Sequence, residues 1–515
     1  MQKRKIPVVD LFAGPGGLGE GFSSVFGTNG ERVFDVGVSI EKDPIAHQTL
    51  LLRSIFRSFP PGKVPDCYYD YVRGDITKSE LFTHPSISKH AQAAFEEARN
   101  VTLGEVPERN VDNWIKEAIG NSDPWVLIGG PPCQAYSLAG RSRMRGMDPE
   151  AFEADSRHFL YKEYLRIIRK FGPAIFVMEN VKGILSSTHG GSPIFGRILA
   201  DLAKPGKGLE YDLRSFVAPG HGESIEPQNF IMESENFGLP QMRHRVILFG
   251  IRRDLASLDH NIILPKSAGK VSVHQAISDL PPLRSRLSKE PDSFDSWLQA
   301  IGETPRALKG WRTEIRMKIE DCMREASAKA SEHNSTGGRF VHGNYGNAVV
   351  MPAHLRTWYR DPKLGGVSLH ESRSHMRSDL HRYLFASCYA AEFGFSPKLA
   401  QFPKALLPNH VNADTDNAPF SDRFRVQLGS LPSTTVVSHI AKDGHYYIHP
   451  DPSQCRSLTV REAARLQTFP DNYFFEGNRT QQYTQVGNAV PPYLAYQIAG
   501  VVSDFLFRAA NANRV

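Results

Sequence analysis

Cysteine is scarce in this sequence, and its pattern excludes several classes of protein. The chain of 515 residues has five cysteines, a number that leaves one unpaired. They are scattered, as Cys67, Cys133, Cys322, Cys388 and Cys455. No two have the close spacing of a zinc knuckle or of a redox motif. The pattern therefore argues against a disulfide scaffold and a structural metal, and it favours a reducing compartment.

Long hydrophobic runs are missing as well. The apolar stretch at residues 6–12 is too short for the core of a signal peptide, and it contains Asp10. The longest apolar segment, residues 493–507, is interrupted by Gln497 and Asp504 and is shorter than a membrane span. We therefore expect no membrane association and a location in the cytoplasm, or in the nucleus if the source is eukaryotic.

An excess of charge of either sign is also lacking. The composition, with 40% hydrophobic and 23% charged residues, is that of an ordinary globular protein. The net charge of +6 favours a polyanionic partner only mildly. A chain of this length exceeds the usual size of a single core, so two domains are expected.

Short apolar runs alternate with amphipathic segments in the first half of the chain. The expected strands are residues 8–12, 34–40, 69–72, 125–128, 174–178 and 246–251. One intervening helix is expected at 159–171. This alternation is typical of a doubly wound, mostly parallel α/β sheet of the Rossmann-like kind. Such sheets bind their ligands at the carboxyl ends of the strands.

The alternation is lost after residue 265 and returns near the C-terminus, where residues 491–506 form an expected amphipathic helix. We therefore expect one domain from 1–265 plus 483–515. The second domain, 266–482, is expected to be irregular. Residues 79–123 also exceed what the fold requires, which indicates a helical insertion.

A glycine-rich loop, from Asp10 to Gly19, follows the first strand and opens a helix. Its glycines permit a tight turn and a close approach of the backbone to a ligand. Glu41 ends the second expected strand, at a suitable distance to accept hydrogen bonds from ribose hydroxyls. Alone, the loop is equally consistent with a nicotinamide or flavin site and with another nucleoside cofactor.

A second loop, Gly129-Gly130-Pro131-Pro132-Cys133-Gln134-Ala135-Tyr136-Ser137, follows the fourth strand. A lone cysteine after an apolar strand is usually a small buried hydrophobe. Here it follows two prolines at the active edge of the sheet, where a thiol can be presented and activated. The next strand ends at Glu179, whose carboxylate requires an ion pair, hydrogen bonds or a catalytic purpose.

These motifs resemble those of the DNA cytosine-5 methyltransferases, in the same order. Three further matches follow in sequence: Gln241-Met-Arg243-His-Arg245, residues 456–471 (RSLTVREAARLQTFPD), and Gln485-Val-Gly487-Asn488-Ala-Val-Pro-Pro492. The resemblance covers residues 8 to about 260 and 420 to 505. Six motifs in the family's order are a specific signal.

The resemblance implies covalent catalysis on a cytosine that is flipped out of DNA. Cys133 matches the nucleophile that adds to C6 and makes C5 reactive. Glu179 matches the carboxylic acid that bonds the N3 edge, and we expect it to hold a proton when it acts. Arg245 matches the arginine near O2, and Arg243 is expected to order the same edge. No metal is required.

The resemblance also implies S-adenosylmethionine as cofactor, with S-adenosylhomocysteine as product. Phe12 would stack near the adenine, Glu41 would hold the ribose, and Asp75 with Ile76 would flank the base. The complete set of matching positions is Phe12, Gly14, Gly16, Gly17, Glu41, Asp75, Ile76, Pro132, Leu160 and Asn488.

The partner implied is double-stranded DNA. The loop that begins at the cysteine is basic and bounded by glycines, so its arginines can hold phosphates, although a solvated surface loop would look similar. The candidate DNA contacts are Gln134, Ser137, Arg141, Arg143 and Arg145. About 210 residues separate Arg245 from Arg456, and this region is expected to recognise the target sequence. Within it, residues 368–383 are suited either to a DNA groove or to a polar helix face.

Three other interpretations remain. An NAD(P)- or FAD-dependent enzyme would explain the glycine loop but leaves Cys133, Glu179 and the C-terminal motifs without a role. One branch of the family methylates tRNA but has a smaller variable region. An inactive relative would have no need of an intact Cys133, Glu179 and Arg245. The early glycine loop favours a bacterial or phage modification enzyme, with a restriction endonuclease as functional partner. Because no interface signal is visible, we expect a monomer, located at the nucleoid.

Overall fold

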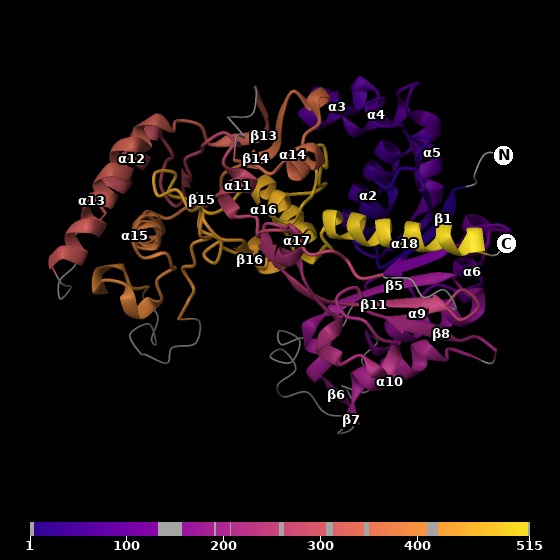
Figure 1. Cartoon of the computed structure of the whole chain (residues 1–515). Helices are drawn as coiled ribbons and strands as arrows, with labels where there is room; N and C mark the ends of the chain where they lie inside the picture. Colours follow the sequence, from indigo (N-terminus) through magenta and orange to yellow (C-terminus); the bar gives the residue numbers. More distant parts are fainter. Residues whose placement is uncertain are drawn as a thin grey trace.

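The structure is a computed structural model, which describes residues 5–131, 157–189, 192–206, 208–256, 262–304, 313–343, 350–408 and 421–512. The chain folds into two lobes (Figure 1). One lobe is built on a central sheet and contains the first half of the chain together with the C-terminal helix. The other lobe contains most of the residues between about 280 and 455.

The central sheet has the strand order β3-β2-β1-β4-β5-β11-β8, and β9 pairs with β11. Its strands are β1 (Ile6–Leu11), β2 (Phe34–Glu41), β3 (Ala98–Asn100), β4 (Val126–Gly129), β5 (Ile175–Val181), β8 (Tyr211–Arg214), β9 (Ile231–Glu233) and β11 (His244–Arg252). The strands from β3 to β5 are parallel, whereas β11 is antiparallel to its neighbours. The predicted doubly wound, mostly parallel sheet is confirmed.

Helices cover both faces of this sheet. One face packs against α1 (Gly17–Ser23) and α18 (Pro492–Ala512). The other packs against α6 (Glu108–Ile119), α9 (Arg157–Phe171) and α10 (Ile194–Ala203). Successive strand residues alternate between the two cores, as Val8 and Val9 do in β1, because side chains alternate along a strand. The expected helices at 159–171 and 491–506 are confirmed.

One predicted strand is wrong. Residues 69–72 lie in helix α3 (Asp66–Arg73), and the third parallel strand is the short β3, inside the expected insertion. Tyr68, Tyr69 and Val72 are buried together because their spacing places them on one side of a helix. Gly74, with φ of 94°, ends that helix in the left-handed conformation that glycine tolerates best. Helices α2 (Pro44–Arg57), α4 (Lys78–Thr83) and α5 (Ser88–Glu97) complete this region.

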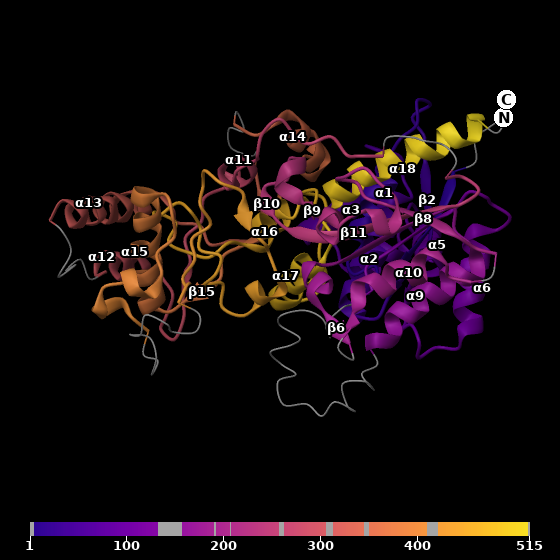
Figure 2. The ribbon, with the colours of Figure 1, turned by 60° about the horizontal axis from the view of Figure 1, so that its bottom comes forward.

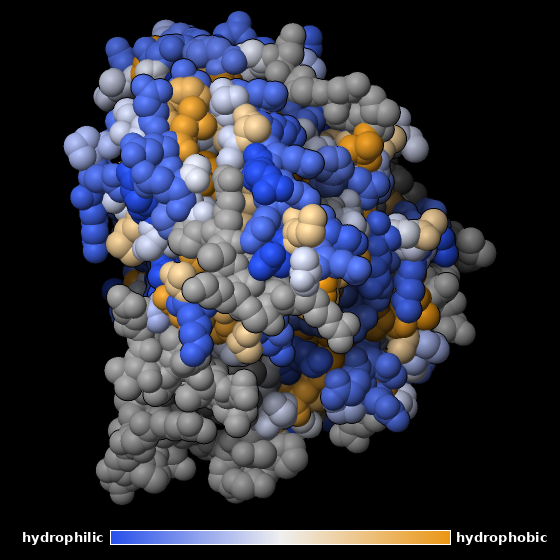
Figure 3. All heavy atoms as spheres, turned by 90° about the vertical axis from the view of Figure 1, so that its left-hand side faces the viewer, coloured by the Kyte–Doolittle hydropathy of each residue, from blue (hydrophilic) through white to orange (hydrophobic). Residues whose placement is uncertain are grey.

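The second lobe is helical at its far end and irregular near the first lobe (Figure 2). Helices α12 (Phe294–Gly302), α13 (Thr313–Lys329) and α15 (Arg377–Phe393) enclose a core around Trp297 and Tyr383. Its remaining elements are α11 (Val273–Ile277), β12 (Arg286–Leu287), β13 (Gly337–His342), α14 (Ala353–Tyr359), β14 (Gly366–Glu371), β15 (Ser374–His375) and β16 (Ser433–Thr434). At this end the described surface is mostly hydrophilic, with hydrophobic side chains in small separate patches (Figure 3).

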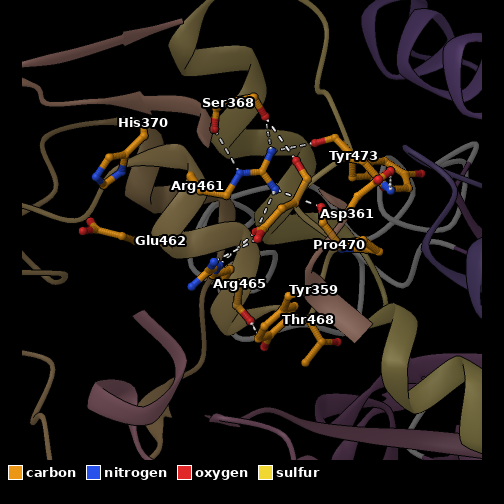
Figure 4. Close-up of polar contacts among 12 residues, drawn as sticks. Tyr359, Asp361, Ser368, His370, Arg461, Glu462, Arg465, Thr468, Pro470 and Tyr473 are labelled. Carbon is orange, nitrogen blue, oxygen red and sulfur yellow. Dashed lines mark hydrogen bonds and ion pairs between the residues drawn. The ribbon is translucent and has the colours of Figure 1, made fainter. Parts of the chain in front are cut away.

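Fully buried arginines join the two lobes. They lie in and around α16 (Val460–Leu466), which precedes α17 (Arg479–Asn488). Arg461 donates hydrogen bonds to Ser368 of β14 and to the carbonyls of Pro470 and Tyr473 (Figure 4). Arg465 forms an ion pair with Asp471 at 2.8 Å. Since burying an unpaired charge is costly, these partners stabilise the segment that follows the variable region.

In the described part of the chain, the strands outside the central sheet form two-stranded pairs. They are β6 (Thr188–His189) with β7 (Ser192–Pro193), β10 (Gln241–Met242) with β16, β12 with β15, and β13 with β14. In the described part of the chain, no helix is long and apolar enough to cross a membrane.

Candidate active site

A cavity of about 530 Å³ opens at the carboxyl edge of the central sheet. Residues at or just after the ends of five adjacent strands line it, namely Val101 after β3, Glu41 of β2, Phe12 after β1, Gly130 after β4 and Glu179 of β5. Segments from the second lobe and from α17 close the other side, and they include Val437, Ser438, Thr484 and Asn488. The cavity therefore lies where a doubly wound sheet normally binds its ligand.

The turn after β1 is held against Glu41. The Gly14 amide donates a hydrogen bond to Glu41 Oε2 at 2.8 Å, and the Asp43 amide donates to Oε1 at 2.7 Å. Burial raises the pKa of the Glu41 carboxyl above its ordinary value. Each carboxylate oxygen can accept a further hydrogen bond, so Glu41 can hold two neighbouring hydroxyl groups. This arrangement suits the ribose of a nucleoside cofactor.

Gly16 and Gly17 serve packing instead. Neither lines the cavity. A Cβ atom on Gly17 would lie 2.2 Å from the carbonyl oxygen of Val490, just before α18. Gly16 has φ of 100°, which a residue with a side chain rarely adopts. Gly17 therefore allows the segment before the C-terminal helix to approach the first loop, whereas a Cβ atom on Gly16 would meet the side chains of Leu50 and Tyr473.

Glu179 and Arg245 form an ion pair at the opposite end of the cavity. Arg245 Nε lies 2.9 Å from Glu179 Oε1, and both side chains are 14% exposed. A Cβ atom on Gly130 would lie 2.9 Å from Glu179 Oε2, so the glycine makes room for the carboxylate. The cavity thus presents an acid and a guanidinium together, which can contact adjacent polar atoms of one planar ligand.

Arg243 lines the same cavity but is almost fully buried. Its Nη1 donates to the carbonyls of Val436, at 2.9 Å, and of Gly487, at 3.2 Å. Burial, together with the nearby Arg245, lowers the pKa of its guanidinium. Arg243 therefore ties the second lobe and α17 to the sheet lobe beside the cavity.

Comparison with known proteins identifies the family. Residues 75–504 match the model of the C-5 cytosine-specific DNA methylases. This chain belongs to that family. It is 32% identical to the type II methyltransferase M.Bpa9945I of Bacillus paralicheniformis, over 97% of this chain and 99% of the relative. It is 25% identical to the DNA (cytosine-5-)-methyltransferase M.ApeKI of Aeropyrum pernix, over 75% of this chain and 82% of the relative.

The fold has a counterpart among solved structures. A crystal structure of a prophage-encoded protein of E. coli, assigned as a DNA modification methyltransferase, superposes with a TM-score of 0.52 at 20% identity. The alignment covers 98% of this chain and all of the other. The family match and the 32% identical relative confirm the resemblance drawn from the motifs, and with it the enzyme class, a DNA (cytosine-5-)-methyltransferase.

The cavity brings together eight of the residues expected in the methyltransferase site. They are Phe12, Gly14, Glu41, Leu160, Glu179, Arg243, Arg245 and Asn488. Seven others lie outside the described residues, namely Pro132, Cys133, Gln134, Ser137, Arg141, Arg143 and Arg145. The cavity wall includes Pro131, the last described residue before them.

Asp75 and Ile76 are not brought to the cavity. They follow α3, on a turn where Asp75 Oδ2 lies 3.2 Å from Arg73 Nε. Their place at the cavity is taken by Val101, Thr102 and Leu103, which no sequence signal pointed to. The strand before those residues has only three residues, too few for a periodic pattern to be recognised.

The His- and Arg-rich stretch at 368–383 is largely internal. His370 and His375 are buried, and they lie within hydrogen-bonding distance of Thr459 and Ser457 respectively. In the part of the stretch that lies on α15, Arg377, Ser378, His381 and Arg382 are partly or fully exposed and form a polar helix face. In the described part of the chain, no group of His, Cys, Asp and Glu is arranged to hold a metal ion.

Proposed function

We propose that this enzyme transfers a methyl group from S-adenosylmethionine to C5 of a cytosine flipped out of a specific double-stranded DNA sequence. The observation that supports this most directly is the continuity of the cavity. Glu41, suited to a ribose, and the Glu179–Arg245 pair, suited to a base edge, line one and the same space. A nucleoside cofactor and a nucleobase could therefore meet there.

At the base end, the residues divide the work on the ring. Glu179 would hold a proton at N3, and Arg245 would donate to O2, so that charge developing on the ring is stabilised. The Cys133 thiolate would then form a bond to C6. After methylation, loss of the C5 proton and breakage of the bond between sulfur and C6 would restore the ring and release the thiolate.

At the cofactor end, the residues fit S-adenosylmethionine. Glu41 would accept from the ribose hydroxyls, the Gly14 turn allows the backbone close to the ligand, and Phe12, Leu160 and Asn488 would line it. When bound, the sulfonium supplies the methyl group as an electrophile. The chain would orient it toward the end of the cavity where Glu179 lies.

The DNA would be held by both lobes. We propose that residues 266–482 form the target-recognition domain, and that 1–265 with 483–515 form the catalytic domain. Gln134, Ser137, Arg141, Arg143 and Arg145 would contact the DNA near the extruded base, and their phosphate contacts would offset the cost of flipping. Because the relative M.Bpa9945I is a type II methyltransferase, we propose that this chain is the modification arm of a restriction-modification system. We further propose that it acts in the cytoplasm as a monomer.

The proposal can be tested by expressing the chain in a bacterial host that lacks cytosine methylation. Bisulfite sequencing of the host DNA should reveal protected cytosines within one short motif. A Cys133→Ser variant, produced at the same level, should protect none. If the wild-type protein binds S-adenosylmethionine but protects no cytosine in DNA, the proposed DNA substrate is wrong and RNA becomes the substrate to test.

A further inference from the structure

The parallel strands place the wall of the cavity in a fixed spatial order. Glu179 of β5 lies at one end, Phe12 and Glu41 lie between, and the turn after β3 lies at the other. Neighbouring strands are about 4.8 Å apart. A ligand whose hydroxyls are held at Glu41, with its reactive end toward Glu179, must therefore extend its remaining part toward β3.

We propose that the turn Val101–Leu103 forms the purine-binding end of the cofactor site, in place of Asp75 and Ile76, which the sequence motif indicates. The inference rests on the proposed use of S-adenosylmethionine. It changes which residues of this chain hold the base, and it gives a function to part of the insertion that precedes β4.

The turn is built to keep its position. Glu41, at the end of β2, pairs with Asn100, at the end of β3. The Asn100 side-chain amide also donates to the carbonyls of Glu41, at 2.9 Å, and of Lys42, at 3.0 Å. These bonds fix the start of the turn beside the proposed ribose site. Leu103 is only 3% exposed, which anchors the far end of the turn in the core under the sheet.

The surface offered there suits a purine ring. Val101, Leu103, Ile45 and Leu160 supply apolar contact, and Thr102 adds a hydroxyl for a ring nitrogen or an exocyclic amine. Sites for flat aromatic ligands typically combine mainly apolar walls with a few polar groups. Across the site, the glycine turn and Glu41 would fix the ribose to which the purine is attached.

Asp75 and Ile76 are committed elsewhere. The Asp75 side chain is 56% exposed and paired with Arg73, which also donates to the Leu364 carbonyl in the second lobe. Ile76 packs at the edge of a different hydrophobic core from the one that contains Leu103. Thr77 begins α4 with a capping box, which fixes this turn without any contact with the cavity.

The test is calorimetric titration of the full-length protein with S-adenosylmethionine in the absence of DNA. Val101→Asp would place a carboxylate against the purine. Thr102→Arg would fill the space that the purine is proposed to occupy. Each should weaken binding by about 100-fold, a change of about 2.7 kcal/mol. Ile76→Asp, the same kind of change at the position that the motif indicates, and Asp75→Ala should stay within about two-fold of wild type.

Thermal melting of each variant distinguishes loss of the site from loss of the fold. The Thr102 side chain is only partly buried, so Thr102→Arg keeps the test decisive if Val101→Asp does not fold. Binding weakened by Asp75→Ala or Ile76→Asp, but not by Val101→Asp or Thr102→Arg, would overturn the inference. A folded Thr102→Arg that binds like wild type would do the same. If the wild-type protein itself fails to bind S-adenosylmethionine, the proposed function fails, and this inference fails with it.

Discussion

Glu179 and Arg245 lie on neighbouring antiparallel strands, offset by two residues on the same face. Glu179 of β5 stands opposite Ile247 of β11, and Arg245 stands opposite Val181. This diagonal offset is within reach of long side chains, and Arg245 Nε lies 2.9 Å from Glu179 Oε1. Because both residues belong to the central sheet, the backbone determines how the two groups are placed at the cavity. The sheet thus holds the proposed base-binding pair rigidly before any substrate arrives.

Glu179→Gln should abolish methylation while leaving cofactor binding intact. The amide can still form a hydrogen bond, but it cannot deliver a proton to N3 of the base. We expect turnover to fall by about 10²- to 10⁴-fold, the usual contribution of a general acid. Transfer of radiolabelled methyl groups to DNA measures turnover, and calorimetry measures cofactor binding.

Glu41→Gln is the matched control for that experiment, because it makes the same change at the other end of the cavity. It should weaken binding of S-adenosylmethionine, since the Gly14 and Asp43 amides then lose a charged acceptor. If Glu179→Gln retained near-normal turnover, the proposed role of Glu179 as the acid at N3 would be wrong.

Arg243→Met should destabilise the protein far more than Arg245→Met. Arg243 Nη1 serves two main-chain carbonyls, those of Val436 and Gly487, which would be left buried without this donor. Each unsatisfied buried acceptor costs about 1–3 kcal/mol. Arg245 is part of an ion pair at the cavity, and its loss should reduce turnover with little change in melting temperature.

Thermal melting and methyl transfer, measured on both variants, separate the two roles. Arg243→Lys should recover part of the lost stability, because an ammonium can still reach one carbonyl. Equal melting temperatures for Arg243→Met and Arg245→Met would contradict the proposed tie between the lobes.

Much of the fold could be predicted because its strands are buried on both faces. Residues 8–12, 34–40 and 174–178 are short runs rich in apolar residues that end at the sites of the motifs, and the structure confirms them as strands. The third strand could not be found in this way. Ala98–Asn100 is a short edge strand, whereas the tyrosines at 68, 69 and 71 have a high intrinsic preference for strands.

Parts of the candidate site could be predicted where residues of one short motif form one wall of the cavity. Gly14 with Glu41, and the strand that ends near Glu179, are recognisable from short local motifs, and these three residues line the cavity. Val437 and Ser438 could not be anticipated, because they come from the variable region and reach the cavity through contacts with a distant helix. A Cβ atom on Gly487 would lie 2.2 Å from the Ser438 amide, which shows how closely α17 packs against that segment.

Gly17→Ala should destabilise the sheet lobe. The added Cβ atom would lie 2.2 Å from the Val490 carbonyl oxygen, a main-chain atom that cannot rotate away. Separating α1 from α18 should cost about 1–3 kcal/mol, the usual range for overpacking, and should lower the melting temperature. Circular dichroism on heating measures this change.

Gly500→Ala provides the control in the partner helix. Nothing lies within 4 Å of a Cβ atom at that position, and alanine favours a helix over glycine by about 1 kcal/mol. This variant should melt at or slightly above the wild-type temperature. A Gly17→Ala protein as stable as Gly500→Ala would contradict the close approach of the two segments.

Asp10→Asn should change how stability depends on pH. Asp10 is fully buried at the end of β1, and burial raises the pKa of its carboxyl from 3.8 to about 8, although Arg57 partly opposes this. The unfolded chain releases the proton near pH 4 and the folded chain only near pH 8, so Asp10 makes the protein less stable as pH rises between those values. Asparagine does not titrate.

The advantage of the Asp10→Asn variant in unfolding free energy should therefore grow up to pH 8 and then level off, with an upper limit of about 6 kcal/mol. Urea unfolding at intervals from pH 6 to 9 measures it, with Asp35→Asn, an exposed position on β2, as control. Parallel stability curves for wild type and Asp10→Asn would show that Asp10 is already ionised in the folded protein at pH 6.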